Sequence, residues 1–306
     1  MRVLLVGWSS VLHGESTAGD VLSTAAVADH LRSQGHTVDE AWSPAMFLVH
    51  GSCGGRRYDD VDPGNYDTVV WVCGPLAGEP VREFHARFAD VRRIAVGVSV
   101  LDADDPAVTG FDVVVARDAP GVPGRRDLAA RPVAGAVERT VEVVGVFLTH
   151  GQGEYGARRR HEAVGGVLGN WLGGLDVARL ELDTRLDPRD WRSPATPDQV
   201  LAVVSRLDVV VTTRLHGLVL ALRCGVPALA LDPVAGGGKV SAQAAAWGWP
   251  GLVGADELLE RGPVVLDEQF AWCRSGAGRA AAHRARAEAG GAGVGQLARL
   301  STALSG

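Results

Sequence analysis

One short segment places a permanently charged side chain two positions before a titratable one. The apolar run DVVVTT predicts a buried strand, and Arg214 and His216 follow it at the start of a helix that ends at Gly225. A helix N-terminus presents N–H groups that favour anions, and the arginine fork fits a carboxylate or a phosphate. Histidine transfers protons near neutral pH. We therefore expect a catalytic, anion-binding site here. The alternative is that Arg214 pairs with acidic side chains of the protein and that His216 is a partly buried histidine with a structural role.

Other candidate side chains stand near the ends of further predicted strands. Arg117 closes the run FDVVVAR, and its alternative role is an ion pair with Asp118 or Asp112. His150 closes the run VEVVGVFLTH. Lys239 follows three glycines, which either cradle an anion with their N–H groups or form a flexible loop with a solvated lysine. Because the carboxyl ends of parallel strands meet at one edge of a sheet, such residues can share a site.

The polar loop WSSVLHGESTAGD, between the first predicted strand and the first helix, should face the corresponding edge of its own sheet. It carries Glu15, Gly19 and Asp20, and Asp20 has a structural alternative as the N-cap of the helix that follows. In the second half of the chain, Arg158–His161 opens a predicted helix, either as a solvated face or as a contact for an anion.

These residues need a scaffold of buried parallel strands, and both halves of the sequence predict one. Short Val-, Leu- and Ile-rich runs alternate with helix-like segments up to about residue 118, and the alternation restarts at residue 141. The Pro-, Gly-, Ala- and Arg-rich stretch 119–140 separates the two halves. The expected fold class is therefore α/β, with two doubly wound Rossmann-like domains facing a cleft.

The chain of 306 residues is long enough for two such domains with separate cores. We place the N-terminal domain at 1–135 and the C-terminal domain at 136–266. From 267 to 306 the Ala-, Arg- and Glu-rich sequence predicts one or two helices, interrupted at Gly290 and Gly291, that brace the domains against each other.

The composition argues against several classes of protein. The formal net charge is -6 and the pI is about 5.8, so no global basic field is available to nucleic acid or to an anionic membrane. No apolar run is long enough to span a bilayer and no signal peptide is recognisable, which favours a cytoplasmic protein. The four cysteines are scattered and no metal-ligand spacing is present, so neither disulfides nor a metal is predicted.

The segment 208–233 as a whole resembles the signature of the polysaccharide pyruvyl transferase family. In that family a strand leads into Arg-Leu-His-Gly, a helix of small and aliphatic residues follows, and Gly-x-Pro precedes another strand, as in DVVVTTRLHGLVLALRCGVPALALDP. The stretches GGGKV with Lys239, AQAAAWGWPGLV, VVVARDAP with Arg117, and TAGDVLSTAAVADHL resemble further pieces of the family. Two departures are Gly121 in place of a serine and the absence of an asparagine before Gly19.

The resemblance implies a glycosyltransferase-B-like pair of domains that uses phosphoenolpyruvate to place a pyruvyl ketal on hydroxyls of a saccharide, in polysaccharide biosynthesis and without a further cofactor. It implies the acceptor on the N-terminal domain and phosphoenolpyruvate on the C-terminal one. Arg214, Arg117 and Lys239 would be the counter-charges, and His216 the general acid that protonates the methylene carbon. The other substrate-binding candidates are Leu215, Gly217, Gly19, Asp20, Glu15 and His150.

Alternatives remain open beside this function. A nucleotide-sugar-dependent glycosyltransferase would use the same architecture, with Arg214 and Lys239 holding a diphosphate. The two departures leave room for a non-catalytic relative that binds an anionic metabolite or a partner protein. Glu15 or Asp20 would orient or deprotonate the acceptor hydroxyl, and the sequence leaves the acceptor and any homo-oligomer unspecified. Four tryptophans are candidates either for stacking on sugar rings or for the core: Trp171, Trp191, Trp247 and Trp249.

Overall fold

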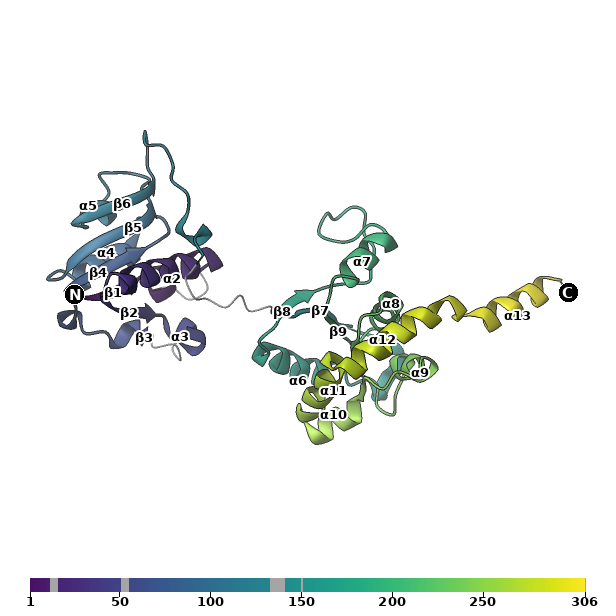
Figure 1. The fold of residues 1–306 in the computed structure, drawn as a ribbon. Coiled ribbons are helices and arrows are strands. Elements are labelled where there is room, and N and C mark those ends of the chain that lie inside the picture. Colours follow the sequence, from purple (N-terminus) through teal and green to yellow (C-terminus); the bar gives the residue numbers. More distant parts are fainter. Residues whose placement is uncertain (12–15, 51–54, 133–140, 150, 306) are drawn as a thin grey trace. The chain divides into compact units, whose positions relative to one another are not determined.

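The computed structural model describes residues 1–11, 16–50, 55–132, 141–149 and 151–305. The chain divides into two compact units, Met1–Glu138 and Arg139–Gly306. Each unit contains one sheet whose strands pair in parallel (Figure 1), which confirms the predicted α/β class with two parallel-sheet domains. Within the described ranges, no helix is long and apolar enough to cross a membrane.

The sheet of the first unit has the strand order β3-β2-β1-β4-β5-β6. Its strands are β1 (Arg2–Val6), β2 (Thr37–Trp42), β3 (Arg56–Arg57), β4 (Thr68–Val72), β5 (Arg92–Ser99) and β6 (Val113–Asp118). Since β1 pairs with β2 on one side and with β4 on the other, the chain builds the sheet outwards from β1 in both directions. In such a sheet, ligands bind beyond the carboxyl ends of the two strands where the order reverses, which here are β1 and β4.

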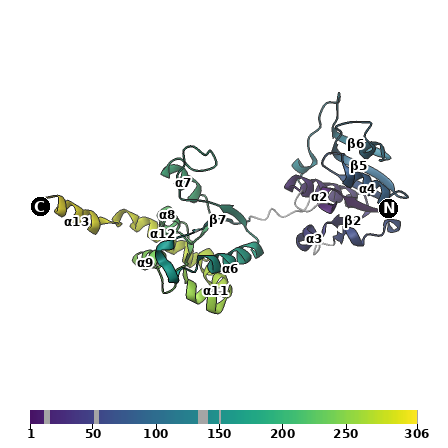
Figure 2. The ribbon, with the colours of Figure 1, turned by 180° about the vertical axis from the view of Figure 1, so that it is seen from behind.

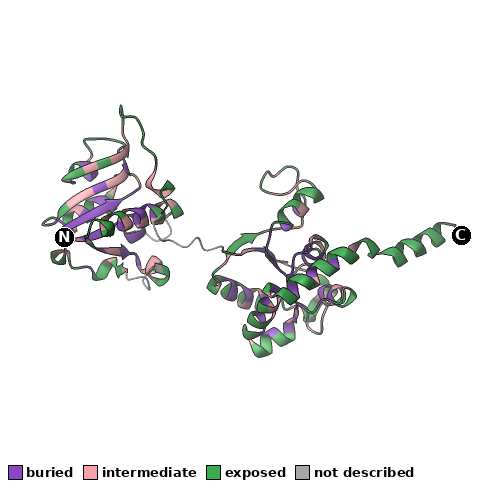
Figure 3. Cartoon of the chain, viewed as in Figure 1, coloured by how far each residue is buried: buried purple, intermediate pink, exposed green. Residues whose placement is uncertain are grey.

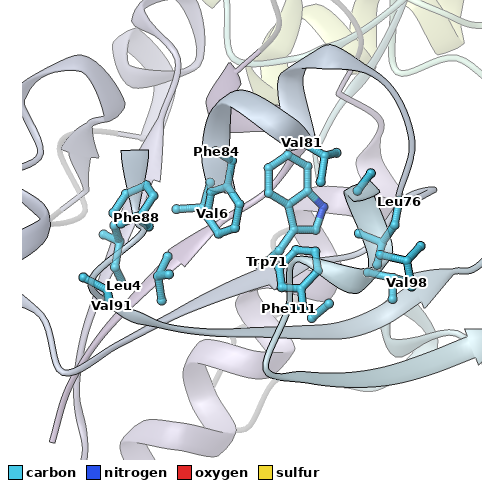
Figure 4. Close-up of a cluster of buried hydrophobic side chains, with 14 of the residues drawn as sticks. Leu4, Val6, Trp71, Leu76, Val81, Phe84, Phe88, Val91, Val98 and Phe111 are labelled. Carbon is cyan, nitrogen blue, oxygen red and sulfur yellow. The ribbon is translucent and has the colours of Figure 1, made fainter. Parts of the chain in front are cut away.

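Helices cover both faces of this sheet. They are α1 (Trp8–Val11), α2 (Ala18–Ser33), α3 (Pro44–His50), α4 (Glu79–Arg87) and α5 (Pro106–Thr109), with single 3-10 turns at Tyr58–Asp60, Pro63–Asn65 and Leu128–Ala130. On one face, Trp71 of β4 packs edge-on against Phe84 of α4, with ring centroids 5.1 Å apart (Figure 4). On the other face, Ala28 of α2 belongs to a cluster with Val3 and Leu5 of β1. The two clusters bury the strands from both sides.

The sheet of the second unit has the strand order β11-β10-β9-β7-β8. Its strands are β7 (Val143–Phe147), β8 (Ala178–Glu181), β9 (Val209–Thr212), β10 (Ala228–Asp232) and β11 (Leu252–Gly254). The strand β9 pairs with β7, although β8 lies between them in the sequence. The order therefore reverses between β7 and β9, and the carboxyl ends of these two strands form the expected ligand-binding edge.

The helices of the second unit also cover both faces of its sheet. They are α6 (His161–Gly174), α7 (Pro197–Val204), α8 (Leu215–Cys224), α9 (Lys239–Ala246), α10 (Ala255–Arg261), α11 (Val264–Arg274), α12 (Gly276–Glu288) and α13 (Val294–Ser305), with 3-10 turns at Gly153–Arg158 and Ala289–Gly291. Successive residues of β9 point to opposite faces: Val209 and Val211 join a core cluster with α6 and α11, whereas Val210 joins one with α8. The predicted helix near residue 157 begins later, at His161.

The C-terminal segment forms three helices where the sequence predicted one or two. Phe270 and Cys273 of α11 and Ala282 of α12 are buried in the cores of the second unit. A 3-10 turn, Ala289–Gly291, follows α12, and α13 continues beyond it, away from the sheet of its own unit (Figures 1 and 2). No residue of α13 is buried (Figure 3). That these helices brace the two units against each other stays a prediction.

Candidate functional site

The carboxyl ends of β7 and β9 are joined by hydrogen bonds at the edge where the strand order reverses. The N–H of Thr213 donates to the carbonyl oxygen of Phe147 (3.0 Å), and the hydroxyl of Thr213 accepts from the N–H of Thr149 (2.7 Å). This joint fixes the start of both loops that follow the strands. Arg214 is the N-cap of α8 and His216 is the second residue of this helix, so both follow directly after the residues that connect β7 and β9.

Gly217 has a packing role in this corner. It is buried, and a Cβ at this position would lie 2.2 Å from the hydroxyl oxygen of Thr212. The same hydroxyl oxygen accepts the N–H of Arg214 (2.9 Å). Glycine therefore lets α8 begin directly against β9. Gly217 does not line the pocket beside the corner, so it supports the site through packing.

The guanidinium of Arg214 is held by two contacts within its unit. Its Nε donates to the carbonyl oxygen of Leu148 (2.6 Å), and its Nη2 donates to the carboxylate of Asp183 (3.1 Å). The arginine side chain is 16% exposed, so the ion pair is partly desolvated. Leu148 follows β7 and Asp183 follows β8, so residues beyond two neighbouring strands orient this guanidinium.

A pocket of about 320 Å³ opens beside the β9–α8 corner; we call it the corner pocket. Its lining residues come from the segments after β7, β8, β9 and β10: Thr149, Gln152, Glu154, Thr184, Arg185, Arg214, Leu215, His216 and Lys239. Three permanent positive charges face a single carboxylate, that of Glu154, which lies 3.8 Å from the Nζ of Lys239. His216 is exposed and has no hydrogen-bond partner in the described part of the chain. The corner pocket therefore favours an anion and leaves an imidazole free to act on it.

Lys239 lines the corner pocket, but the three glycines before it do not form the anion cradle offered by the sequence. The backbone N–H groups of Gly236–Gly238 already donate within the protein, to Asp256, Val234 and Asp232 in turn, at 2.7, 2.9 and 2.7 Å. A ligand therefore finds no free donor among these three groups. The loop nevertheless delivers Lys239, which is the first residue of α9.

Asp232 takes the place that an external anion would occupy in this loop. It is 1% exposed at the end of β10, and its carboxylate accepts the N–H groups of Val234 (3.1 Å), Gly238 (2.7 Å) and Ser241 (2.7 Å). Two of these donors belong to the start of α9, where N–H groups lack partners within the helix. A buried side chain thus fixes both the loop and the helix that carries Lys239.

Gln152 enters the corner pocket in an unusual backbone conformation. Its φ of 63° and ψ of 56° lie in the left-handed region, which few residues other than glycine adopt. Its Oε1 lies 2.8 Å from the Nε2 of His161, which is 7% exposed. The Nδ1 of His161 is buried without a hydrogen-bond partner in the described chain. Burial, and then the charge of Arg159, hold the pKa of His161 below its ordinary value, so the ring is neutral at pH 7.

The first unit has its own pocket, of about 410 Å³, beyond β1 and β4; we call it the N-terminal pocket. Its lining residues are Trp8, Thr17, Gly19, Asp20, Cys73, Gly74, Pro75, Arg117 and Asp127. Here two carboxylates face one guanidinium, so the charge balance is opposite to that of the corner pocket. Both pockets stand at the reversal point of their sheet.

Asp20 lines the N-terminal pocket and is not the N-cap offered as its structural alternative. The N-cap of α2 is Thr17, and Asp20 is the third residue of the helix. The carboxylate of Asp20 accepts the N–H of Thr17 (2.8 Å), and the hydroxyl of Thr17 accepts the N–H of Asp20 (3.3 Å). This reciprocal pair is a capping box, and it holds the carboxylate, 8% exposed as a residue, in one orientation.

Arg117 also lines the N-terminal pocket, but its charge is balanced by neighbours. Its Nε donates to Asp118 (2.7 Å), its Nη1 pairs with Asp127, and its Nη2 donates to the hydroxyl of Ser99 (2.6 Å). The pair with Asp118 is one of the two alternatives that the sequence offered; Asp112 instead accepts a backbone N–H at the start of β5. The hydrogen bond to Asp118, with that to Asp127, raises the pKa of the Arg117 guanidinium above its ordinary value.

The remaining candidates are either not described or have other contacts. Glu15 and His150 lie outside the described residues. The arginines of Arg158–Arg160 contact their own neighbourhood: Arg159 pairs with Glu162 at 3.0 Å, and none of the three lines the corner pocket. The described residues contain no group of three His, Cys, Asp or Glu side chains that could hold a metal ion.

Sequence reasoning missed about half of the lining of the corner pocket. The missed residues are Thr149, Gln152, Glu154, Thr184 and Arg185. A signal for some of them exists, because Thr149 lies at the carboxyl end of one predicted strand and Thr184 directly follows another. Nothing in the sequence marks the left-handed conformation of Gln152.

A larger pocket, of about 480 Å³, adjoins the corner pocket; we call it the tryptophan pocket. The two share a wall, because Asp183 lines the tryptophan pocket and pairs with Arg214 of the corner pocket. Trp191 lines it and is 92% exposed, whereas Trp171 and Trp249 are buried in cores. An indole left this open to water offers a flat apolar surface to a ligand.

Comparisons with known proteins bear on the second unit. Residues 178–233, from the start of β8 to just after β10, match the family model described as polysaccharide pyruvyl transferase. The match confirms the resemblance over this stretch. No curated protein matches the chain.

Three solved glycosyltransferases show the range of structural similarity. The spinosyn rhamnosyltransferase SpnG complexed with thymidine diphosphate is 13% identical, with 95% of this chain and 96% of that chain covered and a TM-score of 0.35. The calicheamicin glycosyltransferase CalG4 is 13% identical, with 99% of this chain and 97% of that chain covered and a TM-score of 0.34. MurG of Acinetobacter baumannii is 14% identical, with 93% of this chain and 94% of that chain covered and a TM-score of 0.30. All three TM-scores are below 0.5, and the fold assignment rests on the two sheets of the chain itself.

Proposed function

We propose that this protein is a transferase that moves a pyruvyl group from phosphoenolpyruvate to hydroxyls of a saccharide acceptor. The observation that carries the proposal is the corner pocket, where Arg185, Arg214 and Lys239 surround the exposed imidazole of His216. Three of these four residues lie in the stretch 178–233 that matches the family model. Phosphoenolpyruvate carries a phosphate and a carboxylate, so a pocket with three fixed positive charges and one carboxylate suits it.

The charges of the two units support a division of the substrates between them. The corner pocket has an excess of positive charge and the N-terminal pocket an excess of carboxylates. Carboxylates accept hydrogen bonds from hydroxyl groups and repel anions. We therefore assign phosphoenolpyruvate to the second unit and the acceptor hydroxyls to the first. Asp20, oriented by Thr17, is the group to orient or deprotonate an acceptor hydroxyl.

His216 supplies the proton of the first step. The imidazolium protonates the methylene carbon of phosphoenolpyruvate, and an acceptor hydroxyl adds to the adjacent carbon and loses its proton to a base. A second hydroxyl then displaces the phosphate from that carbon, and its proton leaves with the phosphate. The products are a pyruvyl ketal and inorganic phosphate, so no oxidant or reductant is consumed. Arg214, oriented by Leu148 and Asp183, stabilises the anionic groups throughout.

The test is the release of inorganic phosphate from phosphoenolpyruvate with and without saccharide acceptors. We expect release that requires an acceptor, and a protein that releases no phosphate with any acceptor contradicts the proposal. His216→Gln should abolish release at an unchanged melting temperature, because the side chain is exposed. His30→Gln, at an exposed position of α2, is the control and should keep full activity. An unimpaired rate in His216→Gln removes that residue from the mechanism.

A nucleotide-sugar-dependent glycosyltransferase is the second candidate, and the tryptophan pocket favours it. A nucleobase can stack on Trp191, and the carboxylate of Glu181 in the same pocket can accept hydrogen bonds from ribose hydroxyls. A diphosphate would then lie in the adjoining corner pocket, beside Arg214 and Lys239.

Thermal-shift titrations separate the two candidates, because a ligand that binds the folded state raises the melting temperature. Stabilisation by phosphoenolpyruvate and not by nucleoside diphosphates supports the pyruvyl transferase. Stabilisation by nucleoside diphosphates that disappears in Trp191→Ala supports the glycosyltransferase instead.

The proposal includes a cytoplasmic location. Cys73, Cys224 and Cys273 are free thiols, which suit a reducing compartment. Fractionation of producing cells, with the protein recovered in the cytosolic fraction, is the expected result.

A further inference from the structure

We propose that Gln152 is a ligand-binding residue of the corner pocket and that His161 is the positioning residue that turns its amide N–H groups toward an anion. The inference rests on the proposed function for the identity of the ligand, phosphoenolpyruvate. Its physical content is more general: a neutral, directional donor stands among the positive charges of Arg185, Arg214 and Lys239.

The side chain of Gln152 connects the corner pocket to the buried start of α6. It lines the pocket, and its Oε1 lies 2.8 Å from the Nε2 of His161, the first residue of that helix. The backbone at Gln152 is left-handed, with φ 63°, a conformation that glycine adopts at lower cost. A residue held in such a conformation reports a constraint from its surroundings. The hydrogen bond to His161 is the contact that its side chain makes with those surroundings.

The position of the hydrogen on the His161 ring determines which end of the amide is free. A neutral imidazole has one N–H, and because Oε1 of Gln152 can only accept, the hydrogen must be on Nε2. The Nδ1 is then an unprotonated nitrogen, which is buried without a partner in the described chain. Protonation would place a charged N–H donor at this buried position with no acceptor, which is costly. The ring therefore stays neutral and donates to Oε1.

The charged groups around His161 are consistent with this neutral state. They are Arg159, Asp232, Glu154 and Lys239; the two cations lower its tendency to take a proton and the two carboxylates raise it. Burial adds the largest contribution against the charged ring.

With Oε1 occupied by His161, the amide nitrogen of Gln152 is left to the ligand. No hydrogen-bond partner of this NH₂ group lies in the described part of the chain, and Gln152 is half-buried at the pocket wall. Two neutral N–H donors beside three cations add direction where the cations add charge. The ligand class is therefore an anion with at least one terminal oxygen in reach of the amide, a phosphate or a carboxylate.

The test is a double-mutant cycle read by the binding of inorganic phosphate and of phosphoenolpyruvate in a calorimeter, with the full chain and no acceptor. Gln152→Gly removes the amide and relieves the left-handed backbone, so we expect affinity to fall about tenfold or more at an equal or higher melting temperature. Gln152→Glu keeps the contact to His161 but adds a negative charge, and should weaken binding further.

His161→Ala should weaken binding in the otherwise unchanged protein, and should have no additional effect in the Gln152→Gly background, because it acts only through that side chain. His161→Gln restores an N–H donor and should recover part of the affinity. Glu162→Gln, at an exposed position one residue further along α6, is the control and should bind as the unchanged protein does.

Three outcomes overturn the inference: an affinity of Gln152→Gly within twofold of the unchanged protein, an equal effect of His161→Ala in both backgrounds, or an unchanged protein that binds neither anion. The proposed function fails separately. If no phosphate is released in response to an acceptor, the proposed transferase activity is wrong. The double-mutant cycle measures binding without turnover, so it still tests the role of Gln152.

Discussion

The two arginines predicted to hold the donor differ in what already balances their charge. Arg214 has one carboxylate partner, Asp183, and opens onto a pocket with two further cations. Arg117 has two carboxylate partners and a hydroxyl, which together fill its guanidinium. An arginine satisfied by its own protein offers little net charge to an incoming anion. In the proposed function, donor binding therefore depends on Arg214, whereas the contacts of Arg117 connect β6 to the residues around Asp127.

Adding a single methyl group at Gly217 should affect both stability and anion binding. Gly217→Ala places a methyl group where the Thr212 hydroxyl already lies, so we expect a loss of about 1–3 kcal/mol of unfolding free energy. Displaced Thr212 also releases the backbone of Arg214, so anion affinity should fall as well. Denaturant titration and calorimetry measure the two effects.

The matched control is Gly169→Ala within α6, where nothing lies within 4 Å of the new Cβ. Alanine restricts the unfolded chain, so this variant should be stabilised by about 0.5–1 kcal/mol. Equal stabilities of the two variants would contradict the packing role of Gly217.

Stability should depend on pH through His161, which is buried, and His85, which is partly buried. Burial lowers the pKa of His161 and of His85 from the ordinary value of 6.5. The unfolded chain then takes up protons more readily than the folded protein below that value, so the unfolding free energy is highest above pH 6.5 and decreases as the pH falls through the folded pKa. Denaturant titrations at pH 7.5, 6.5 and 5.5 should show this decrease. It should become smaller in His161→Gln and in His85→Gln, and a slope unchanged in both variants would rule these residues out as its source.

At the scale of elements, Asp232 links the end of β10 to the start of α9. Asp232→Ala leaves three backbone N–H groups without their acceptor, at a cost of about 1–3 kcal/mol in unfolding free energy. Since α9 begins at Lys239, the loss should also weaken anion binding. Asp256→Ala is the comparison, because this exposed residue accepts a single N–H in the same loop. Asp256→Ala should lower the unfolding free energy by less than Asp232→Ala does. A larger loss in Asp256→Ala would show that Asp232 is not the residue that fixes this loop.

The elements that could be predicted from sequence are those whose pattern is local. The strand β9, the helix α8 and the strand β10 match their predicted ranges within a residue, because a continuous apolar run and the Gly-Val-Pro stop define them. The short elements α3 and β3 were not predicted. A two-residue strand exists only because β2 pairs with it, and a seven-residue helix is too short to be stable alone.

The pocket residues that could be predicted are likewise those close together in the sequence or placed by a general rule of parallel sheets. Arg214, Leu215 and His216 share one predicted corner, and the parallel-sheet rule brings Lys239 to the same edge. The contribution of Gln152 depends on β7 lying beside β9, and that of Arg185 on β8 lying beside β7, which only the strand order reveals. Asp20 stands near the predicted helix start, but the alternative role of N-cap is wrong: the N-cap is Thr17, and Asp20 is the third residue of α2.

At the scale of the whole molecule, each unit has its own sheet, its own cores and its own pocket. Residues 139–306 expressed alone should therefore fold cooperatively and bind phosphate with the affinity of the full chain, whereas residues 1–138 should fold without binding it. Circular dichroism and calorimetry test both halves. Phosphate affinity that returns only when the halves are mixed would contradict the assignment of the donor to the second unit.

The exposure of Trp191 has a practical consequence for anyone who follows this protein in solution. All eight tryptophans are described, and the other seven are buried or partly buried. Collisional quenchers such as iodide should therefore reach one indole far more easily than the rest. Shielding of that red-shifted fraction of the fluorescence gives an unlabelled optical signal for occupation of the neighbouring cavity, before any product is known.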